Sequence, residues 1–307
     1  MNNIREELES ISGFFDIGKL EQIARLGGIA NDNFSVRTTT GDFVVKFVRE
    51  HGADNLKTID PLFRILEKHN FPAAYYLRNP AGEFVFDNGN TVAIAMHKEK
   101  GTVPDTSNRS VYVMGETLAQ LHSVPVRGLE ARLTWFNPNF LPQGLMDLDS
   151  KVDSETIKRL RGASNKIGNL EEYDLQKSII HGDYHPGNFL FFEDRLSTVL
   201  DWEEASYGHS LIDIAYATFI IFFKESKFNA EGFSSFMDGY QSVRILTSNE
   251  REKLSTFVQF VGLTVSIWII LRYGVDSADP IIEDLANRYW TAELENWEPA
   301  NFASAFW

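Results

Sequence analysis

The segment from His181 to Glu203 constrains this chain more than any other. It reads His-Gly-Asp-Tyr-His-Pro-Gly-Asn and continues through an apolar hairpin-like stretch that ends at Asp201. Asp183 and Asn188 are five positions apart, as in the D-x-x-x-x-N catalytic loop of phosphoryl-transfer enzymes. That chemistry needs one carboxylate to orient the attacking hydroxyl and oxygen ligands to hold Mg²⁺ on the phosphates. We therefore predict Asp183 as the catalytic base and Asn188 and Asp201 as the Mg²⁺ ligands.

The same segment resembles the aminoglycoside phosphotransferase and choline kinase family, which also contains type II homoserine kinases. That family reads H-G-D-x-H-x-x-N and then a strand ending in D-W-E or D-x-E, and the match runs from His181 to Asp213. The resemblance implies an α+β, bilobal, protein-kinase-like fold. Residues 1–97 would form an N-lobe of antiparallel sheet plus helix, and residues 98–307 a mostly helical C-lobe. It also implies that His181 braces the catalytic loop and that Asp213 supports the loop's backbone.

Two features of the N-terminal part predict nucleotide binding. A glycine-containing turn carries Gly27, Gly28 and Asn31, and glycine lets the backbone approach phosphates closely. One hairpin later, Lys46 lies between Val and Phe on a strand, where a lysine is costly to bury unless paired. In kinases a strand lysine of this kind contacts the α- and β-phosphates.

Related kinases pair this lysine with a glutamate from the following helix. The helix expected over 53–70 offers Asp60 and Glu67, and Asp60 lies nearer the family position. We assign Asp60 to the ion pair on that basis. Strands over 84–86 and 91–96 then lead to Met96 and His97, which begin the expected hinge where adenine bonds to backbone groups.

The C-terminal part predicts a small-molecule acceptor. A helix is expected over 110–122, followed by an irregular segment over 124–150 and polar helices over 154–175, segments that wall the acceptor pocket in the family. Only a dozen residues separate Asp201 from Asp213, too few for the activation loop that docks a polypeptide in protein kinases. The family's usual G-D-P before the helix aspartate is replaced here by Gly208-His209-Ser210.

The composition limits which classes of binding partner are expected. The net charge of −14, mostly carried after residue 100, argues against nucleic acid and suits a cationic acceptor. The apolar runs 212–223 and 257–271 fall short of the roughly twenty residues that span a bilayer, so we predict buried helices and no membrane partner. The absence of cysteine and of a signal-like N-terminus suggests a cytoplasmic protein. Its oligomeric state is left open between a monomer and a homodimer.

The leading hypothesis is a kinase that uses Mg²⁺ and ATP or GTP to phosphorylate a hydroxyl of a small, cationic acceptor, such as an aminoglycoside-like molecule or an amino alcohol. Homoserine and choline or ethanolamine are alternative acceptors. A metallohydrolase is a second reading, because His181, Asp183 and His185 alternate along the chain. A nucleotide-binding protein without catalytic activity is a third. The first reading requires Asp183, Asn188 and Asp201 to converge on one cation opposite Lys46.

Overall fold

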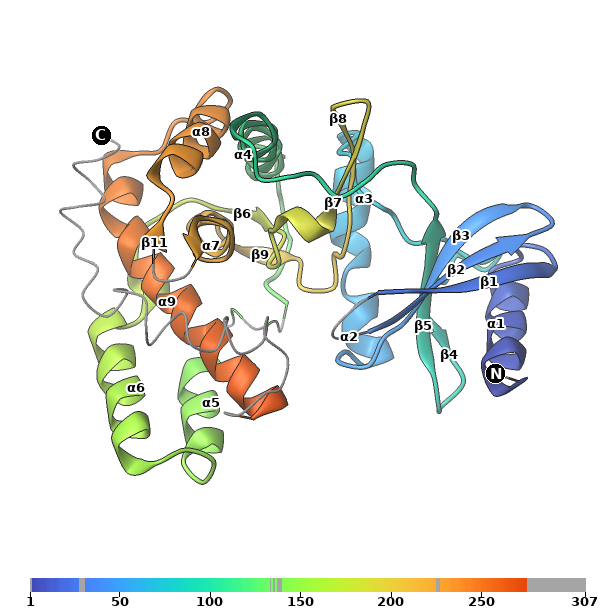
Figure 1. Cartoon of the computed structure of the whole chain (residues 1–307), viewed down its shortest axis with the longest axis horizontal. Coiled ribbons are helices and arrows are strands. Elements are labelled where there is room, and N and C mark those ends of the chain that lie inside the picture. The colour runs from blue at the N-terminus through green and yellow to red at the C-terminus, as the bar shows by residue number, and fades with distance from the viewer. Residues whose placement is uncertain are drawn as a thin grey trace. The chain divides into compact units, whose positions relative to one another are not determined.

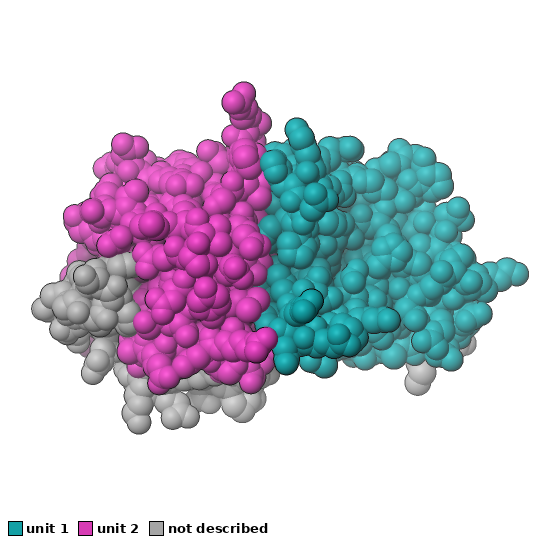
Figure 2. Space-filling model, turned by 90° about the horizontal axis from the view of Figure 1, so that it is seen from above, with its two compact units in different colours: residues 1–103, 189–203 teal, residues 104–188, 204–307 magenta. Residues whose placement is uncertain are grey.

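The chain forms two compact units, shown in cartoon in Figure 1 and coloured separately in Figure 2. Unit 1 comprises residues 1–103 and 189–203, and unit 2 comprises residues 104–188 and 204–307. The computed structural model describes residues 2–27, 31–132, 134, 136, 140–224 and 227–274. Unit 1 contains an antiparallel sheet and unit 2 is mostly helical, so the predicted α+β class is confirmed.

The division differs from the single boundary that we expected after residue 97. Unit 1 runs on to Val103 and also includes the hairpin of β7 (Phe189–Phe192) and β8 (Arg195–Val199). Backbone hydrogen bonds explain this assignment. Thr102 and Phe191 exchange two bonds of 2.9 Å, and Val199 N donates to Pro72 O at 2.7 Å. The hairpin is therefore fastened to the strand-rich part of the chain.

Unit 1 is built on a five-stranded sheet in the order β1-β2-β3-β5-β4, with every neighbouring pair antiparallel. The strands are β1 (Leu20–Leu26), β2 (Asp32–Thr38), β3 (Gly41–Phe47), β4 (Phe86–Asp87) and β5 (Val92–His97). Alternation along β3 sends Phe43, Val45 and Phe47 into one core with residues of α1 (Asn2–Phe14). Lys46 has the opposite parity, so it points to the other face of the sheet.

The helix expected over 53–70 is two helices, α2 (Ala53–Lys57) and α3 (Asp60–Lys68). Pro61 lies in the first turn of α3, where its missing N–H breaks no helical hydrogen bond. Leu62, Phe63 and Leu66 form the buried face of α3. The proline thus explains why a new helix begins at this point.

Unit 2 consists mainly of helices around a short two-stranded sheet of β6 (Lys177–Ile180) and β9 (Ser206–His209). The α-helices are α4 (Asn108–His122), α5 (Phe140–Leu148), α6 (Ser154–Ile167), α7 (Leu211–Ala217), α8 (Ala230–Gln241) and α9 (Ser248–Tyr273). Short 3-10 helices cover Leu170–Glu172 and Pro186–Asn188, and a π-helix covers Thr218–Phe222. A second small ladder joins β10 (Phe223–Lys224) and β11 (Lys227–Phe228). Helix α5 corrects the expectation of a wholly irregular segment over 124–150.

Helices α4 and α8 cross at very close range, and two glycines make this possible. A Cβ on Gly115 would lie 1.9 Å from Phe236 O, and one on Gly239 would lie 2.0 Å from Tyr112 O. This contact fixes α4, whose Met114 carbonyl accepts a 2.7 Å hydrogen bond from Tyr184 in the catalytic loop. Backbone packing between these helices therefore helps to position the loop.

Helix α9 is long and apolar enough, by length and composition alone, to cross a membrane. However, 78% of the residues in its most apolar stretch are buried inside the protein. Its first turn is closed by a capping box in which Thr247 and Glu250 bond to each other's backbone N–H. Such burial is typical of a core helix.

Candidate active site

Lys46 is the centre of a buried polar cluster in unit 1. Its Nζ lies 2.6 Å from Asp201 Oδ1 and also donates to Glu203 Oε1. Tyr76 donates from its hydroxyl to the other Glu203 oxygen at 3.0 Å. Only 5% of Lys46 and 3% of Glu203 is exposed, so each charge depends on its partners in place of water. Lys46 is therefore a buried strand lysine that is paired, as such burial requires.

The titration of this cluster follows from the arrangement of two carboxyl groups around one ammonium group. Burial on its own would lower the pKa of Lys46, but the charges of Asp201 and Glu203 and their hydrogen bonds raise it. Burial and the neighbouring Asp201 charge raise the pKa of Glu203, while Lys46 opposes the rise. Lys46 is therefore charged at neutral pH, and Glu203 is the carboxyl group that retains a proton more readily.

The Asp-Trp-Glu turn is held in place by its tryptophan. The Trp202 ring is fully buried, with its centroid 5.7 Å from the Phe71 ring, and its Nε1 donates to Val199 O at 2.9 Å. Asp201 has a φ of +64°, a left-handed conformation that aspartate tolerates better than most residues. The anchored ring and this turn direct the carboxyl groups on both sides of Trp202 toward Lys46.

The assignment of Asp60 as the partner of Lys46 is wrong. Asp60 pairs with Arg64 at 2.8 Å and with Arg78. The buried face of α3 is apolar, and Glu67 is exposed. The sequence resemblance led to a helix carboxylate, whereas the structure supplies the partner from Glu203, two residues after Asp201. The second acidic residue of Asp-Trp-Glu was the signal that could have identified it.

The other predicted nucleotide residues of unit 1 are placed as follows. Gly27 O accepts a 3.1 Å hydrogen bond from Asn33, and Asn31 Oδ1 accepts one of 3.1 Å from the Arg49 N–H. Gly28 lies outside the described residues. Met96 is buried opposite Val44, and exposed His97 packs its ring 5.2 Å from Phe43. Their roles toward a nucleotide stay predictions.

Asp183, in unit 2, is surrounded by hydrogen-bond donors from the loop and from α7. Asn188 Nδ2 donates to Asp183 Oδ2 at 2.8 Å, and the Tyr216 hydroxyl donates to Oδ1 at 2.5 Å. His185 Nε2 lies 3.5 Å from Oδ2. Partial burial would raise the pKa of Asp183, but the His185 charge and the bonds from His185 and Tyr216 hold it well below its usual range. Asp183 is therefore a carboxylate whose orientation is fixed.

The backbone of the catalytic loop is fixed by a second aspartate. Asp213 is fully buried and accepts hydrogen bonds from His181 N at 2.7 Å and Gly182 N at 2.8 Å. Gly182 has a φ of +81°, and a Cβ there would lie 2.5 Å from Glu204 O, so only glycine fits. His181 Nδ1 accepts from Asp183 N at 3.2 Å, which agrees with the predicted bracing role. The geometry thus gives Asp213 the supporting position that the resemblance implied.

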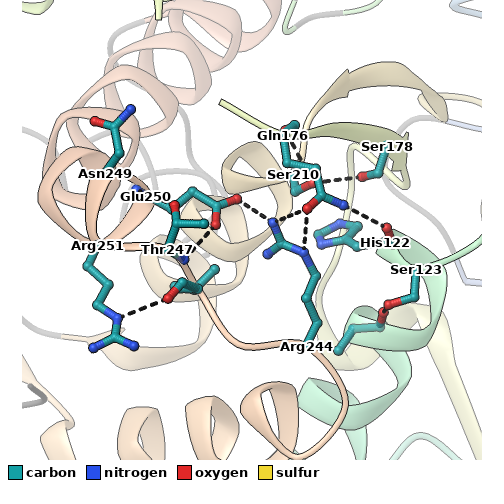
Figure 3. A network of polar contacts seen from close by, with 12 residues as sticks. His122, Ser123, Gln176, Ser178, Ser210, Arg244, Thr247, Asn249, Glu250 and Arg251 are labelled. Carbon is teal, nitrogen blue, oxygen red and sulfur yellow. Dashed lines mark hydrogen bonds and ion pairs between the residues drawn. The ribbon is translucent and has the colours of Figure 1, made fainter. Parts of the chain in front are cut away.

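A chain of buried hydrogen bonds continues from Asp213 to the start of α9, and we call it the relay. His122 Nε2 lies 3.2 Å from Asp213 Oδ2, and His122 Nδ1 lies 2.8 Å from the Tyr240 hydroxyl. Arg244 Nη1 donates to that hydroxyl at 2.7 Å and its Nη2 donates to Glu250. Figure 3 shows the Arg244 guanidinium between Gln176 and Glu250, with His122 beside it. The relay joins the catalytic loop to the capping box of α9.

The proton positions in the relay follow from Arg244. Arginine can only donate, so the Tyr240 oxygen accepts from Arg244 and its O–H must donate to His122 Nδ1. The proton of His122 is then on Nε2, where it donates to the Asp213 carboxylate. Burial lowers the pKa of His122 even though Asp213 opposes the change, so the ring stays neutral. Sequence reasoning missed this relay, because its members lie on α4, α7, α8, α9 and the connection between α8 and α9.

The predicted convergence of Asp183, Asn188 and Asp201 on one cation involves both units and stays a prediction. Within the described ranges of each unit, no group of three or more His, Asp and Glu side chains is placed to hold a metal ion. The Nδ1 atoms of His181 and His185 accept from backbone N–H groups of their own loop. These bonds disfavour the transition-metal site of the metallohydrolase reading.

A model of the phosphotransferase enzyme family matches residues 21–246, which is most of the chain. This chain belongs to that family. It is therefore a phosphotransferase enzyme that acts on a small molecule, and the predicted enzyme class is confirmed. The matched range includes both the Lys46 cluster and the Asp183 loop.

Curated relatives and solved structures agree with this membership. Homoserine kinases of Methylobacillus glycogenes and Granulibacter bethesdensis are 26% and 27% identical, over 84% and 85% of this chain and 82% and 84% of their own lengths. An amicoumacin kinase solved with AMP-PNP, Ca²⁺ and amicoumacin superposes with a TM-score of 0.73 at 14% identity, covering 95% and 93% of the two chains. A microcompartment-associated aminopropanol kinase gives a TM-score of 0.71 at 17% identity, covering 97% and 95%. The predicted protein-kinase-like fold of this family member is confirmed.

Proposed function

We propose that this phosphotransferase transfers the γ-phosphate of ATP or GTP to the hydroxyl of a small alcohol that carries an amino group. The observation that carries the proposal is the fixed carboxylate of Asp183, held by Tyr216 and Asn188 with its pKa well below the usual range. A carboxylate so placed can accept a hydrogen bond from a hydroxyl and orient its oxygen for attack. As the phosphoryl group is transferred, the hydroxyl proton passes to this carboxylate.

The residues of unit 1 fit the phosphates of a nucleotide. Lys46 is charged, and its partners are the oxygens of Asp201 and Glu203. Phosphate oxygens are acceptors of the same kind, so the ammonium group is suited to bind them. Bound Mg²⁺ would supply charge neutralisation and a template for the phosphates. Its proposed ligands are Asp201, whose carboxylate is a hard oxygen donor, and Asn188.

The donor chemistry of Asn188 fits this assignment. Its Nδ2 donates to both the backbone and the side-chain oxygen of Asp183, at 2.9 and 2.8 Å. The amide oxygen is therefore the atom that can bind a cation, and Mg²⁺ prefers oxygen ligands. The same two bonds connect any cation at Asn188 to the orientation of the catalytic carboxylate.

Homoserine is the first acceptor to test, because several of the curated relatives are homoserine kinases and each matches more than three-quarters of this chain. Homoserine and amino alcohols share a hydroxyl and an ammonium group, which suits a chain with a net charge of −14. Aminopropanol, ethanolamine, choline and an aminoglycoside form the comparison set. ATP and GTP, with Mg²⁺ present, should be compared for each acceptor.

The test is a coupled assay of nucleotide turnover over this acceptor panel, repeated with Asp183→Asn. The variant should lose turnover by a factor of about 10² or more while nucleotide affinity stays within about twofold. Asp194→Asn is the matched control, since Asp194 is an exposed turn residue of the β7–β8 hairpin that also has a positive φ. Full turnover in Asp183→Asn would remove the base from the proposal. Turnover with none of the acceptors would remove the acceptor class.

A further inference from the structure

The proposed transfer step leaves one side chain of the Asp183 loop without a role, that of His185. One nitrogen of this ring is held by the loop itself, because Nδ1 accepts a hydrogen bond from Gly187 N at 3.1 Å. A nitrogen that accepts carries no proton, so the N–H of the ring is on Nε2. Nε2 lies 3.5 Å from Asp183 Oδ2, and 31% of the His185 side chain is exposed. A fixed N–H donor on a partly exposed side chain therefore lies beside the catalytic base.

Gly187 leaves the space that this ring occupies. A Cβ on Gly187 would lie 2.7 Å from Cε1 of the His185 ring and 3.0 Å from its Nδ1. Gly187 does not have the left-handed φ that calls for glycine at Gly182. The glycine at position 187 therefore makes room for the ring of His185, and the backbone conformation alone would accept another residue.

The orientation of Asp183 is already fixed by two shorter hydrogen bonds. Tyr216 donates to Oδ1 at 2.5 Å and Asn188 donates to Oδ2 at 2.8 Å. The 3.5 Å between His185 Nε2 and Oδ2 is at the outer limit for a hydrogen bond. The Nε2–H can therefore donate to a closer acceptor when substrates are bound, while the carboxylate stays in place.

We propose that the Nε2–H of His185 donates to an oxygen of the phosphoryl group during its transfer, so that His185 is a catalytic residue. This inference rests on the proposed function, in which Asp183 binds the acceptor hydroxyl. The hydroxyl oxygen lies about 2.7 Å from a carboxylate oxygen, and the phosphoryl oxygens lie about 3 Å from the hydroxyl oxygen. With Nε2 at 3.5 Å from Oδ2, these lengths allow an N–H···O bond of about 2.9 Å to one phosphoryl oxygen.

The step balances while His185 keeps its proton. The hydroxyl oxygen forms a bond to the γ-phosphorus as the bond from that phosphorus to the β,γ-bridging oxygen breaks. The electron pair of the broken bond stays on the nucleoside diphosphate, and the hydroxyl proton passes to Asp183. Negative charge is spread over the three phosphoryl oxygens in the transition state, so a fixed N–H directed at one of them lowers the barrier.

The test measures single turnovers with ATP, Mg²⁺ and the panel acceptor that is phosphorylated fastest. His185→Ala should lower the rate about 10²-fold, as the loss of one such donor does. The steady-state KM values should stay within about threefold. His185→Gln keeps an N–H near the position of Nε2 and should recover about tenfold of the loss, whereas His185→Asn, with its N–H near Nδ1, should not. His69→Ala, at an exposed histidine that ends α3, is the matched control and should keep the wild-type rate.

Gly187→Ala tests the position of the ring by a second route. The added methyl group displaces the His185 ring, and the rate should fall about tenfold or more. In the His185→Ala background the same change should cost less than about twofold, because no ring is left to displace. An equal loss in both backgrounds would overturn the proposal, since the position of the ring would then have no effect on the step.

The Asp183→Asn background distinguishes contact with the phosphoryl group from orientation of the base. Removal of a phosphoryl donor should cost about tenfold or more in this background too, whereas a residue that only orients the carboxylate loses nothing once the carboxylate is gone. No further loss in the double variant would overturn the proposal, as would a wild-type rate in His185→Ala or equal rates in His185→Gln and His185→Asn. If Asp183→Asn keeps full turnover, the proposed function fails. If Asp183→Asn loses turnover and His185→Ala does not, only the role of His185 fails.

Discussion

Replacing Tyr240 with phenylalanine tests whether the relay supports catalysis. The change keeps the ring in its place between α4 and α8 and removes only the hydroxyl. That hydroxyl accepts from Arg244 Nη1 at 2.7 Å and donates to His122 Nδ1 at 2.8 Å. Without it His122 Nδ1 has no donor, and only the bond from Nε2 to the Asp213 carboxylate still orients the ring. Asp213 keeps its bonds from the backbone of the Asp183 loop but is held less firmly by His122.

The magnitude follows from the two bonds lost. Leaving a buried hydrogen-bonding group unpaired costs about 1–3 kcal/mol, and both His122 and Arg244 lose a partner. Arg244 retains Gln176 and Glu250, so its loss falls at the low end. We expect the free energy of unfolding to fall by about 2–4 kcal/mol. If about 1.4 kcal/mol of that cost appears as misplacement of Asp183, kcat falls about tenfold.

The assay combines urea unfolding with steady-state kinetics at saturating nucleotide, and Tyr112→Phe on the exposed side of α4 is the control. The KM for the nucleotide should change less than kcat, because Lys46, Asp201 and Glu203 lie in unit 1 and only the proposed Mg²⁺ ligand Asn188 lies in the loop that the relay supports. The Nδ1 resonance of His122 should shift, because this nitrogen loses its hydrogen bond from Tyr240. A variant that loses the expected stability but keeps the wild-type kcat would show that the relay is structural only. Unchanged stability would show that the two hydrogen bonds of the Tyr240 hydroxyl do not contribute to the free energy of unfolding as expected.

Three further predictions concern single contacts. Glu203→Ala should raise the nucleotide KM about tenfold or more, because Lys46 loses a buried partner. Asp60→Ala should change this KM less than about twofold. Equal effects of the two variants would restore Asp60 as a candidate partner of Lys46. Tyr216→Phe removes a bond to a charged group worth about 1.5–3 kcal/mol, so the pKa of Asp183 should rise. A carboxyl group with a depressed pKa stabilises the fold above its unfolded-state pKa, and this stabilisation is lost as the pH falls. In Tyr216→Phe, kcat/KM and stability should therefore begin to fall at a higher pH than in the wild type. Identical pH profiles of the two proteins would contradict this prediction. Gly182→Ala should lower kcat and also lower the unfolding free energy by about 1–3 kcal/mol, because a Cβ at this position would lie 2.5 Å from Glu204 O. A stable, active variant would show that the loop can shift to make room.

Local residue chemistry was sufficient to predict much of the site. The sequence block around Asp183 and the support from Asp213 both depend on short motifs with fixed spacing. These features depend on contacts over a few residues, or on a resemblance that includes both partners. The N-cap of α4 is a contact of the same local kind, since the Ser107 side chain accepts from Ser110 N, just after it in the chain.

Predictions failed where a partner comes from a distant segment. Asp60 was chosen on spacing, but Arg78, eighteen residues further on, binds it, and Glu203 reaches Lys46 from 157 residues away. The hairpin of residues 189–203 joined unit 1 through backbone bonds to Pro72 and Thr102, which no side-chain pattern reveals. The relay was missed for the same reason. Periodicity predicts which face of a helix is buried but not which polar groups meet there.

The relay also changes how the run from Tyr240 to Thr247 should be interpreted. An acceptor with a carboxylate needs a cation, and Arg244 is the arginine in this run. In the structure Arg244 is 9% exposed, and its guanidinium binds Tyr240, Gln176 and Glu250. Freeing it would leave the Glu250 carboxylate buried without its charged partner, at a cost of several kcal/mol. Arg244 therefore belongs to the relay that supports the Asp183 loop. A homoserine carboxylate, if it is bound here, must be recognised by another group.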